Sequence, residues 1–141
     1  LPIDLKPTSS SIIEYVVSLA SNYDAILYFL YVDSIAMNKE NMIMSRVSVD
    51  SLNQKVRDEL NESHEAIEKL TKNIPLEYKV LIKNGNIVDT INGISEELIP
   101  DLIIIGNNGH DNISDYILGT TAMNVIKSTK YPILVVPTYA K

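Results

Sequence analysis

Short apolar runs alternate with stretches of helical periodicity along the whole chain, and this alternation constrains the fold most. The apolar runs are continuous and of strand length, as in strands buried on both faces. Between them, apolar residues recur every three or four positions, which is typical of amphipathic helices. We expect strands at 1–4, 26–32, 76–82, 102–105 and 133–136 and helices at 8–21, 48–71, 87–98 and 120–128. This order predicts an α/β fold: a three-layer, doubly wound, five-stranded parallel sheet with helices on both faces.

Local signals refine these elements. The longest helix, over 48–71, contains Ser51 and Gln54 at the spacing of a capping box. Asn84 and Gly85 form a dipeptide that commonly turns the chain after a strand. We expect core or boundary packing for the three tyrosines that flank the second strand, which are Tyr23, Tyr28 and Tyr31.

Length and composition set the class of protein. A chain of 141 residues with 45% apolar and 21% charged residues predicts a single domain over residues 1–141. The absence of cysteine excludes disulfide scaffolds, zinc-thiolate sites and cysteine nucleophiles. A net charge of −6 argues against general nucleic-acid binding, which needs clustered lysine and arginine.

The most apolar stretch, residues 26–32, is far shorter than the roughly 20 residues of a membrane span. No basic segment precedes an apolar one as in a secretory leader, so we expect no membrane association and a cytoplasmic location. The chain starts at Leu1, and we interpret residues 1–4 as a strand truncated on its amino-terminal side.

Three of the five glycines, Gly106, Gly109 and Gly119, fall within fourteen residues. Gly106 and Gly109 follow a strand, where positive φ would let the backbone approach a ligand. Gly119 and Thr120 open a helix, whose free N–H groups suit phosphate. Doubly wound sheets bind ligands at the carboxyl ends of their strands. This junction is therefore a candidate phosphate site, with simple turning and helix capping as the alternative.

The spacing fits neither the P-loop of NTPases nor the dinucleotide fingerprint, because no Gly-Lys-Ser/Thr and no Gly-x-Gly-x2-Gly occurs. The run Gly106-x2-Gly109-x9-Gly119-Thr120 instead resembles the nucleotide-binding members of the universal stress protein (UspA-like) family. Residues 101–106 and 131–137 are similar to the most characteristic segments of that family, and residues 1–4 to its first strand with a signature Asp4. The resemblance implies strand order 3-2-1-4-5, an adenine nucleotide at the switch point and a homodimer paired through the last strand, Ile133 to Val136.

The resemblance also implies which residues touch the nucleotide. It assigns adenine and ribose to the first two strands, and the phosphates to the glycine loop and the helix that follows. Asp4 directly follows an apolar strand, where it could accept a ribose hydroxyl, although a simple turn acid is the alternative. The implied nucleotide-binding set is Pro2, Ile3, Asp4, Val32, Gly106, Gly109, His110, Gly119, Thr120 and Thr121.

The chain departs from the family pattern in its charges. Family members often have a basic residue right after the second glycine, where this chain has His110. The stretch between Asp101 and Val125 contains no lysine or arginine, but it contains two aspartates, Asp111 and Asp115. Phosphate would then be held by backbone N–H groups and hydroxyls, with Mg²⁺ offsetting the two aspartates. We expect modest affinity, with AMP and ADP competing with ATP.

The sequence shows no nucleophile–base pair and no metal-ligand spacing, and His64 fits a surface position on a helix. We therefore expect a regulatory, stress-response module that binds ATP or another adenine nucleotide without a committed reaction, and at most slow incidental hydrolysis. The alternative is a dimeric interaction module of the same fold with a vestigial phosphate loop. A receiver or flavodoxin-like domain fits less well, because Pro137 and Thr138 stand where a receiver has lysine.

Overall fold

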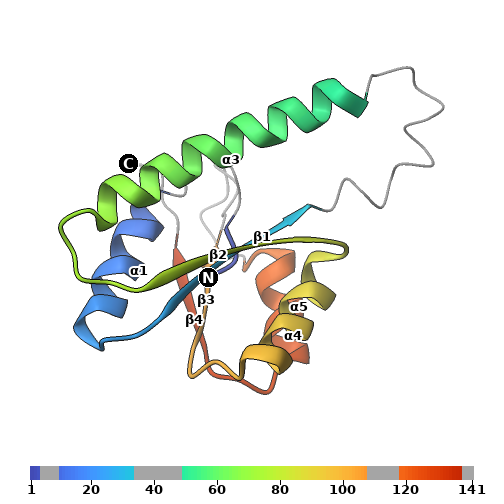
Figure 1. The fold of residues 1–141 in the computed structure, drawn as a ribbon. Helices are drawn as coiled ribbons and strands as arrows, with labels where there is room; N and C mark the ends of the chain where they lie inside the picture. The colour runs from blue at the N-terminus through green and yellow to red at the C-terminus, as the bar shows by residue number, and fades with distance from the viewer. Residues whose placement is uncertain (4–9, 34–48, 108–117, 138–141) are drawn as a thin grey trace.

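The computed structural model describes residues 1–3, 10–33, 49–107 and 118–137 (Figure 1). Helices and parallel strands alternate, which confirms the predicted α/β class. The helices are α1 (Ser10–Asn22), α3 (Val49–Thr71), α4 (Ile87–Leu98) and α5 (Thr120–Ser128). The strands are β1 (Leu27–Asp33), β2 (Tyr78–Asn84), β3 (Ile103–Asn107) and β4 (Ile133–Pro137). Within these ranges no helix is long and apolar enough to span a bilayer.

The strands form two parallel pairs. In the first, β1 lies beside β2, with Leu27 opposite Tyr78 and the register running to the end of both strands. In the second, β3 lies beside β4, with Ile103 opposite Ile133. In the described part of the chain no ladder joins the two pairs. The continuous order 3-2-1-4-5, which counts residues 1–4 as the first strand and β1 to β4 as the second to fifth, therefore stays a prediction.

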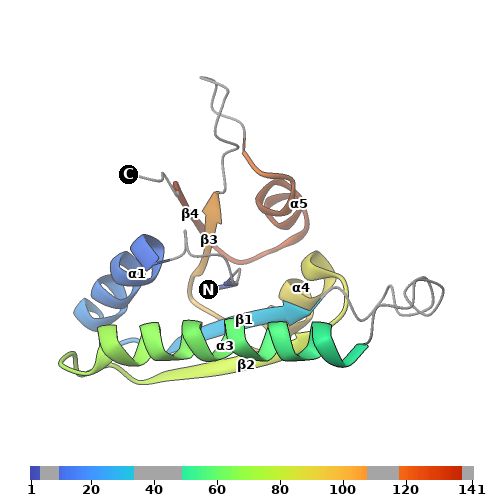
Figure 2. The same ribbon diagram turned by 90° about the horizontal axis from the view of Figure 1, so that it is seen from above.

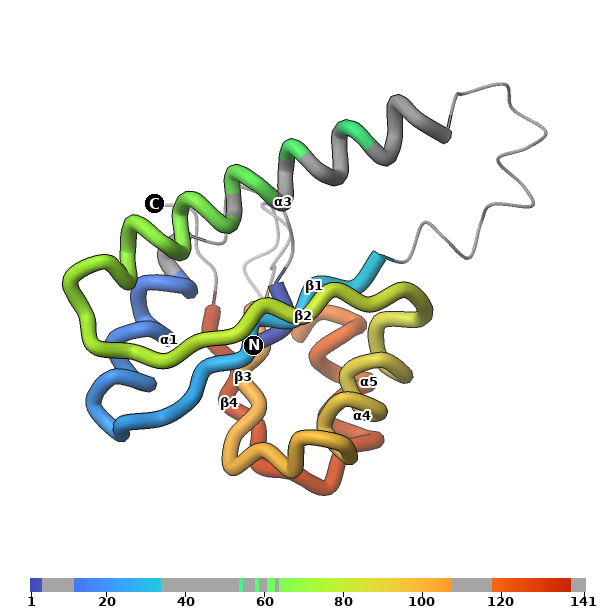
Figure 3. The backbone as a smooth tube through the Cα atoms, in the orientation of Figure 1, coloured from blue at the N-terminus to red at the C-terminus, as the bar shows by residue number. Residues whose placement is uncertain are grey.

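Residues 1–3 run beside β1 in the middle of the molecule (Figure 3). Pro2 forms an isolated parallel bridge with Leu30. The Leu30 N–H donates to the carbonyl of Leu1 at 2.8 Å, and the Ile3 N–H donates to the carbonyl of Leu30 at 2.9 Å. The first predicted strand is thus present as a single bridge on the side of β1 opposite β2.

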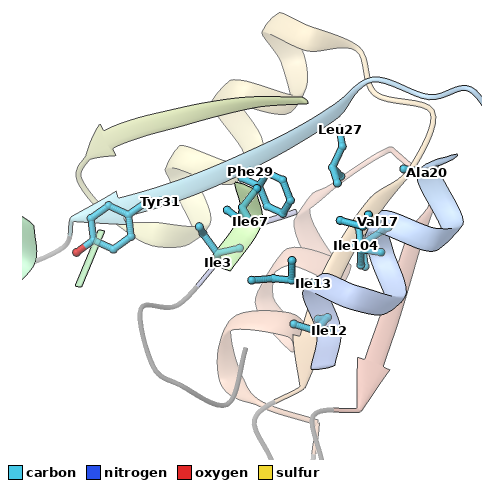
Figure 4. Close-up of a cluster of buried hydrophobic side chains, with 11 residues drawn as sticks. Ile3, Ile12, Ile13, Val17, Ala20, Leu27, Phe29, Tyr31, Ile67 and Ile104 are labelled. Atoms are coloured by element: carbon cyan, nitrogen blue, oxygen red, sulfur yellow. The ribbon is translucent and has the colours of Figure 1, made fainter. Parts of the chain in front are cut away.

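One core cluster lies under α1 and the carboxyl half of α3 (Figure 4). The Phe29 ring is fully buried at its centre and meets the Tyr78 ring edge-on, with centroids 5.9 Å apart. Burial of large side chains of this kind contributes most of the stability of such a domain. The cluster consists of Ile3, Ile12, Ile13, Val16, Val17, Ala20, Leu27, Phe29, Tyr31, Ile67 and Ile104.

A second core cluster lies under α4 and α5, which cover the other side of the strands (Figure 2). Leu30 belongs to this cluster although its neighbours Phe29 and Tyr31 belong to the first, because successive strand side chains point to opposite faces. Helices therefore cover both faces of the strands. The second cluster consists of Leu30, Ile91, Ile103, Ile105, Ala122 and Val125.

Several element boundaries differ from the sequence-based expectation. Helix α3 begins at Val49, so Ser51 lies inside its first turn and the capping box with Gln54 is wrong. The Gln54 side chain instead donates to Asp58 Oδ1, one turn ahead, at 2.9 Å. Strand β2 starts and ends two residues later than predicted. Its pairing with β1 runs from Tyr78, opposite Leu27, to Asn84, opposite Asp33. The turn follows at Gly85, which has a φ of 139°.

The three tyrosines beside β1 have different environments. Tyr31 is buried in the first core cluster. Tyr28 is half-buried, and the Lys79 ammonium lies 5.7 Å from the centre of its ring. The expectation of core or boundary packing is wrong for Tyr23, which is 77% exposed in the turn that follows α1.

Candidate functional site

The carboxyl end of β3 is joined to the amino-terminus of α5 by a side chain. Asn107 is the last residue of β3, and its Oδ1 accepts a hydrogen bond of 2.9 Å from the N–H of Gly119, the N-cap of α5. The first helical bond of α5 runs from the Met123 N–H to the Gly119 carbonyl, at 2.9 Å. The N–H groups of residues 120–122 therefore have no acceptor within the helix and point toward its positive end. Such a helix end can bind an anion.

The amino-terminus of α4 is occupied by its own cap, in contrast to that of α5. Asn86 Oδ1 accepts from the Val88 N–H at 2.9 Å and from the Asp89 N–H at 3.1 Å. Asp89 also places a carboxylate in the first turn of α4. Gly119 has no side chain to cap α5, and the first turn of α5 holds no acidic residue. Of these two helix ends, only that of α5 has no side-chain cap among the described residues.

In the described part of the chain, no basic side chain lies between β3 and the last turn of α5. The first lysine after β3 in the described chain is Lys127, in the last turn of α5. Lys130 follows it and forms a 2.7 Å ion pair with Glu96, whose hydrogen bond and charge raise the pKa of this lysine. Both lie at the end of α5 remote from Gly119. Between β3 and the last turn of α5, the described residues therefore offer an anion backbone N–H groups rather than basic side chains.

The structure places the predicted site residues in two groups. Pro2 and Ile3 lie beside β1 at Leu30, two positions before Val32, which is half-buried near the carboxyl end of the strand. Gly119 opens α5, followed by an exposed Thr120 and a half-buried Thr121. The predicted site residues Asp4, Gly109 and His110 fall outside the described residues, as do Asp111 and Asp115.

One expectation about the glycines is wrong. Gly106 is a regular residue of β3 opposite Val136, so its backbone is extended and lacks the positive φ that the sequence suggested. Among the glycines that the structure describes, Gly85 has a positive φ. Gly119 itself has φ −56° and ψ 149°, which any residue can adopt. The value of glycine at position 119 therefore lies in its missing side chain.

Sequence reasoning missed the two asparagines that define these helix ends. Asn86 had a usable signal, because an asparagine followed three residues later by an acid is a common start of a helix. Asn107 had none, since its partner Gly119 is twelve residues further along the chain. A contact of this kind depends on which separated segments the fold brings together.

The described histidine lies away from these helix ends. His64 is on α3, with half of its side chain exposed, and its Nε2 is 3.3 Å from Glu68 Oε1. This confirms the surface position expected for it. Within residues 1–3, 10–33, 49–107 and 118–137, no three histidine, aspartate or glutamate side chains lie close enough together to hold a metal ion.

The outer side of β4 forms a groove with α5 that has both apolar and polar lining residues. Leu134 and Val136 pack against the first core cluster and Ile133 against the second. Val135 faces the groove, which has a volume of about 320 Å³. The groove is lined by Ile126, Thr129, Tyr131, Ile133 and Val135.

Comparison with known proteins agrees with this geometry. The model of the Universal stress protein family matches residues 1–137. Universal stress protein MJ0577 of Methanocaldococcus jannaschii is 32% identical over 87 residues, which are 62% of this chain and 54% of that protein. The matched part of the chain thus spans about half the length of this relative. Its structure, described as a structure-based assignment of the biochemical function of MJ0577, superimposes with a TM-score of 0.74 and 26% identity over 96% of this chain and 92% of that one.

Two further solved structures share the fold. A universal stress protein in complex with cAMP has a TM-score of 0.69 and 19% identity, and covers 99% of this chain and 94% of its own. The universal stress protein from Archaeoglobus fulgidus in complex with dAMP has a TM-score of 0.61 and 15% identity, and covers 95% of this chain and 92% of its own. At these identities the likeness concerns the fold alone.

Proposed function

This chain belongs to the universal stress protein family, and we propose that it binds an adenine nucleotide and acts as a regulatory, stress-response module without a committed reaction. The main support is the open amino-terminus of α5, fastened to the end of β3 by Asn107 and Gly119. Related structures of the same fold are described in complex with cAMP and with dAMP, which supports an adenine nucleotide as the ligand class. ATP is our first candidate, with AMP and ADP as competitors.

The proposed site uses backbone groups for the phosphates. The N–H groups of residues 120–122 and the hydroxyls of Thr120 and Thr121 would hold the terminal phosphates. Mg²⁺ would offset the negative charge that remains, because the described residues around Gly119 supply no lysine or arginine. We propose the full contact set as Pro2, Ile3, Asp4 and Val32 for adenine and ribose, and Gly106, Gly109, His110, Gly119, Thr120 and Thr121 for the phosphates.

We propose that the two strand pairs are halves of one sheet in a single domain over residues 1–141. Residues 1–3 already lie on the free side of β1. Placing β3 beside them would give the order 3-2-1-4-5, and it would bring the carboxyl ends of β1 and β3 to either side of residue 4. This switch point is where doubly wound sheets bind their ligands.

We also propose a homodimer through β4. Its residues Ile133 to Val136 remain partly exposed, although they form an apolar strand. An unpaired apolar edge promotes aggregation unless another strand covers it, and a second copy can do so across a two-fold axis. The groove beside Val135 would then be buried between the two copies.

Calorimetric titration with ATP and Mg²⁺ tests nucleotide binding. The wild-type protein should bind saturably, whereas Gly119→Asp should not bind, because its carboxylate would take the helix N–H groups and repel phosphate. Gly93→Asp is the matched control, since Gly93 is exposed on α4 and a side chain there meets nothing within 4 Å. Absence of binding at millimolar ATP would contradict the proposal.

The alternative function is a dimeric interaction module whose phosphate loop is vestigial. The lack of lysine and arginine between Asp101 and Val125 favours it, as do Asp111 and Asp115 in the same stretch. Mass spectrometry of small molecules released from the purified protein separates the two functions. Co-purified ATP or AMP supports the nucleotide module, and an empty protein supports the interaction module.

A further inference from the structure

A single hydrogen bond joins the last residue of β3 to the residue that opens α5. Asn107 Oδ1 and the Gly119 N–H are 2.9 Å apart, and the contact is partly shielded from solvent. A side chain built on Gly119 would place its Cβ 3.5 Å from the same Oδ1, an ordinary van der Waals distance. The amide of Asn107 therefore sits directly against the N-cap of α5.

Asn107 accepts the N–H group of the residue at which α5 opens. It accepts the hydrogen bond of Gly119, so that group is satisfied within the protein. The three N–H groups that follow it have no acceptor within the helix, because helical bonding starts with Met123. The side chain thus sets the direction of the free N–H groups relative to the end of β3.

The chemical type of this side chain matters as much as its position. An asparagine oxygen accepts the Gly119 hydrogen bond while staying neutral. An aspartate would accept the same bond equally well, but would add a full negative charge beside the phosphate site. Geometry and charge can therefore be separated by two substitutions at one position.

We propose that Asn107 is a positioning residue that orients the amino-terminus of α5 for phosphate, so that it sets affinity for the phosphates of a nucleotide and not for its nucleoside. This inference rests on the proposed nucleotide-binding function. Asn107 acts through Gly119 and the helix that Gly119 opens.

The opposite end of α5 supplies a control. There the Asn92 Nδ2 of α4 donates to Ser128 Oγ at 2.7 Å, so an asparagine fastens each end of the helix. Asn92→Ala removes the bond remote from Gly119. It should lower stability but leave phosphate affinity unchanged.

The test compares ATP with adenosine by calorimetric titration, both with Mg²⁺ present, in the wild type and in Asn107→Ala, Asn107→Asp and Asn92→Ala. We expect Asn107→Ala to weaken ATP binding about fivefold, as for the loss of one net hydrogen bond. We expect Asn107→Asp to weaken it about tenfold or more at low salt, with partial recovery at high salt. Adenosine affinity should stay within a factor of about two in all four proteins, since a neutral ligand does not sense the added charge.

Two outcomes would overturn the role of Asn107. One is ATP binding by both Asn107 variants with wild-type affinity, and the other is an equal loss of ATP and adenosine affinity, which marks a general structural role. Failure of the proposed function looks different, because the wild-type protein itself would then bind no ATP. Aspartate preserves the shape of asparagine and its hydrogen bond to Gly119, so Asn107→Asp keeps the test valid if the alanine variant does not fold.

Discussion

Asn86 and Gly119 hold equivalent positions at the starts of α4 and α5, with nearly the same backbone angles. Asn86 has φ −69° and ψ 132°, and Gly119 has φ −56° and ψ 149°. Asn86 uses its side chain to accept two helix N–H groups. Gly119 leaves the matching groups of α5 open. The two helix ends thus differ in the side chain at the N-cap, and the proposed function depends on that difference.

Gly119→Asn should convert the end of α5 into a copy of the end of α4. The new side chain should cap the helix and restrict the unfolded chain, which together raise the free energy of unfolding by about 0.5 kcal/mol. The same side chain should compete with phosphate, so ATP affinity should fall while stability rises. Thermal unfolding and titration of the same sample check both effects. A less stable variant would show that position 119 does not accept a side chain.

Asn86→Ala should lower the free energy of unfolding by about 1 kcal/mol, because two N–H groups of α4 lose their acceptor. ATP affinity should not change, since this cap lies outside the proposed site. Urea unfolding measures the loss, and Asn86→Asp should restore most of it. Asn84→Ala, an exposed asparagine two positions earlier, is the control and should have a smaller effect. An equal loss in both variants would contradict the role of the cap.

Ile99→Gly should stabilise the protein. Ile99 ends α4 in the left-handed region, with φ 49° and ψ 61°, and 72% of the residue is exposed. A β-branched residue in this conformation is strained by about 1 kcal/mol, which glycine avoids at the end of a helix. Asp24→Gly is the comparison, because Asp24 has the same φ of 49° and aspartate tolerates it better. Differential scanning calorimetry should show a larger gain for Ile99→Gly than for Asp24→Gly.

Val135→Lys should prevent the proposed dimer. Val135 lines the groove beside β4, so a lysine there would place a charge in the middle of the contact between two copies. Sedimentation at micromolar concentration should give a dimer for the wild type and a monomer for the variant. Ile82→Lys is the control, since Ile82 is 56% exposed on β2, away from the groove. A monomeric wild type would refute the dimer.

The sequence was most informative where periodicity was strong. The helix expected at 87–98 matches α4 at both ends, and the helix at 120–128 matches α5. Boundaries that depend on pairing were missed: β2 extends to Asn84 because Asp33 on the neighbouring strand is there to pair with it. The Ser51 capping box failed because the pattern of polar residues does not reveal which of several serines precedes the first turn.

The candidate site was predictable in part. The spacing of Gly119 and Thr120 located the open helix end, since that signal is local. The conformation of Gly106 was not predictable, because its extended backbone follows from pairing with Val136 on a strand thirty residues later. The bond between Asn107 and Gly119 was invisible for the same reason. Both depend on contacts between segments that are distant in the chain.

Phe29 and Leu30 are neighbours in β1 whose side chains enter opposite cores. Removing one residue from the strand would turn every later side chain to the other face, so Tyr31 would leave the first core and Val32 would change sides. The number of residues from Leu27 to Asp33 is thus as restricted as their identity. Insertions and deletions that leave the protein folded should fall in the connections between elements, while the strands that carry the site keep a constant length.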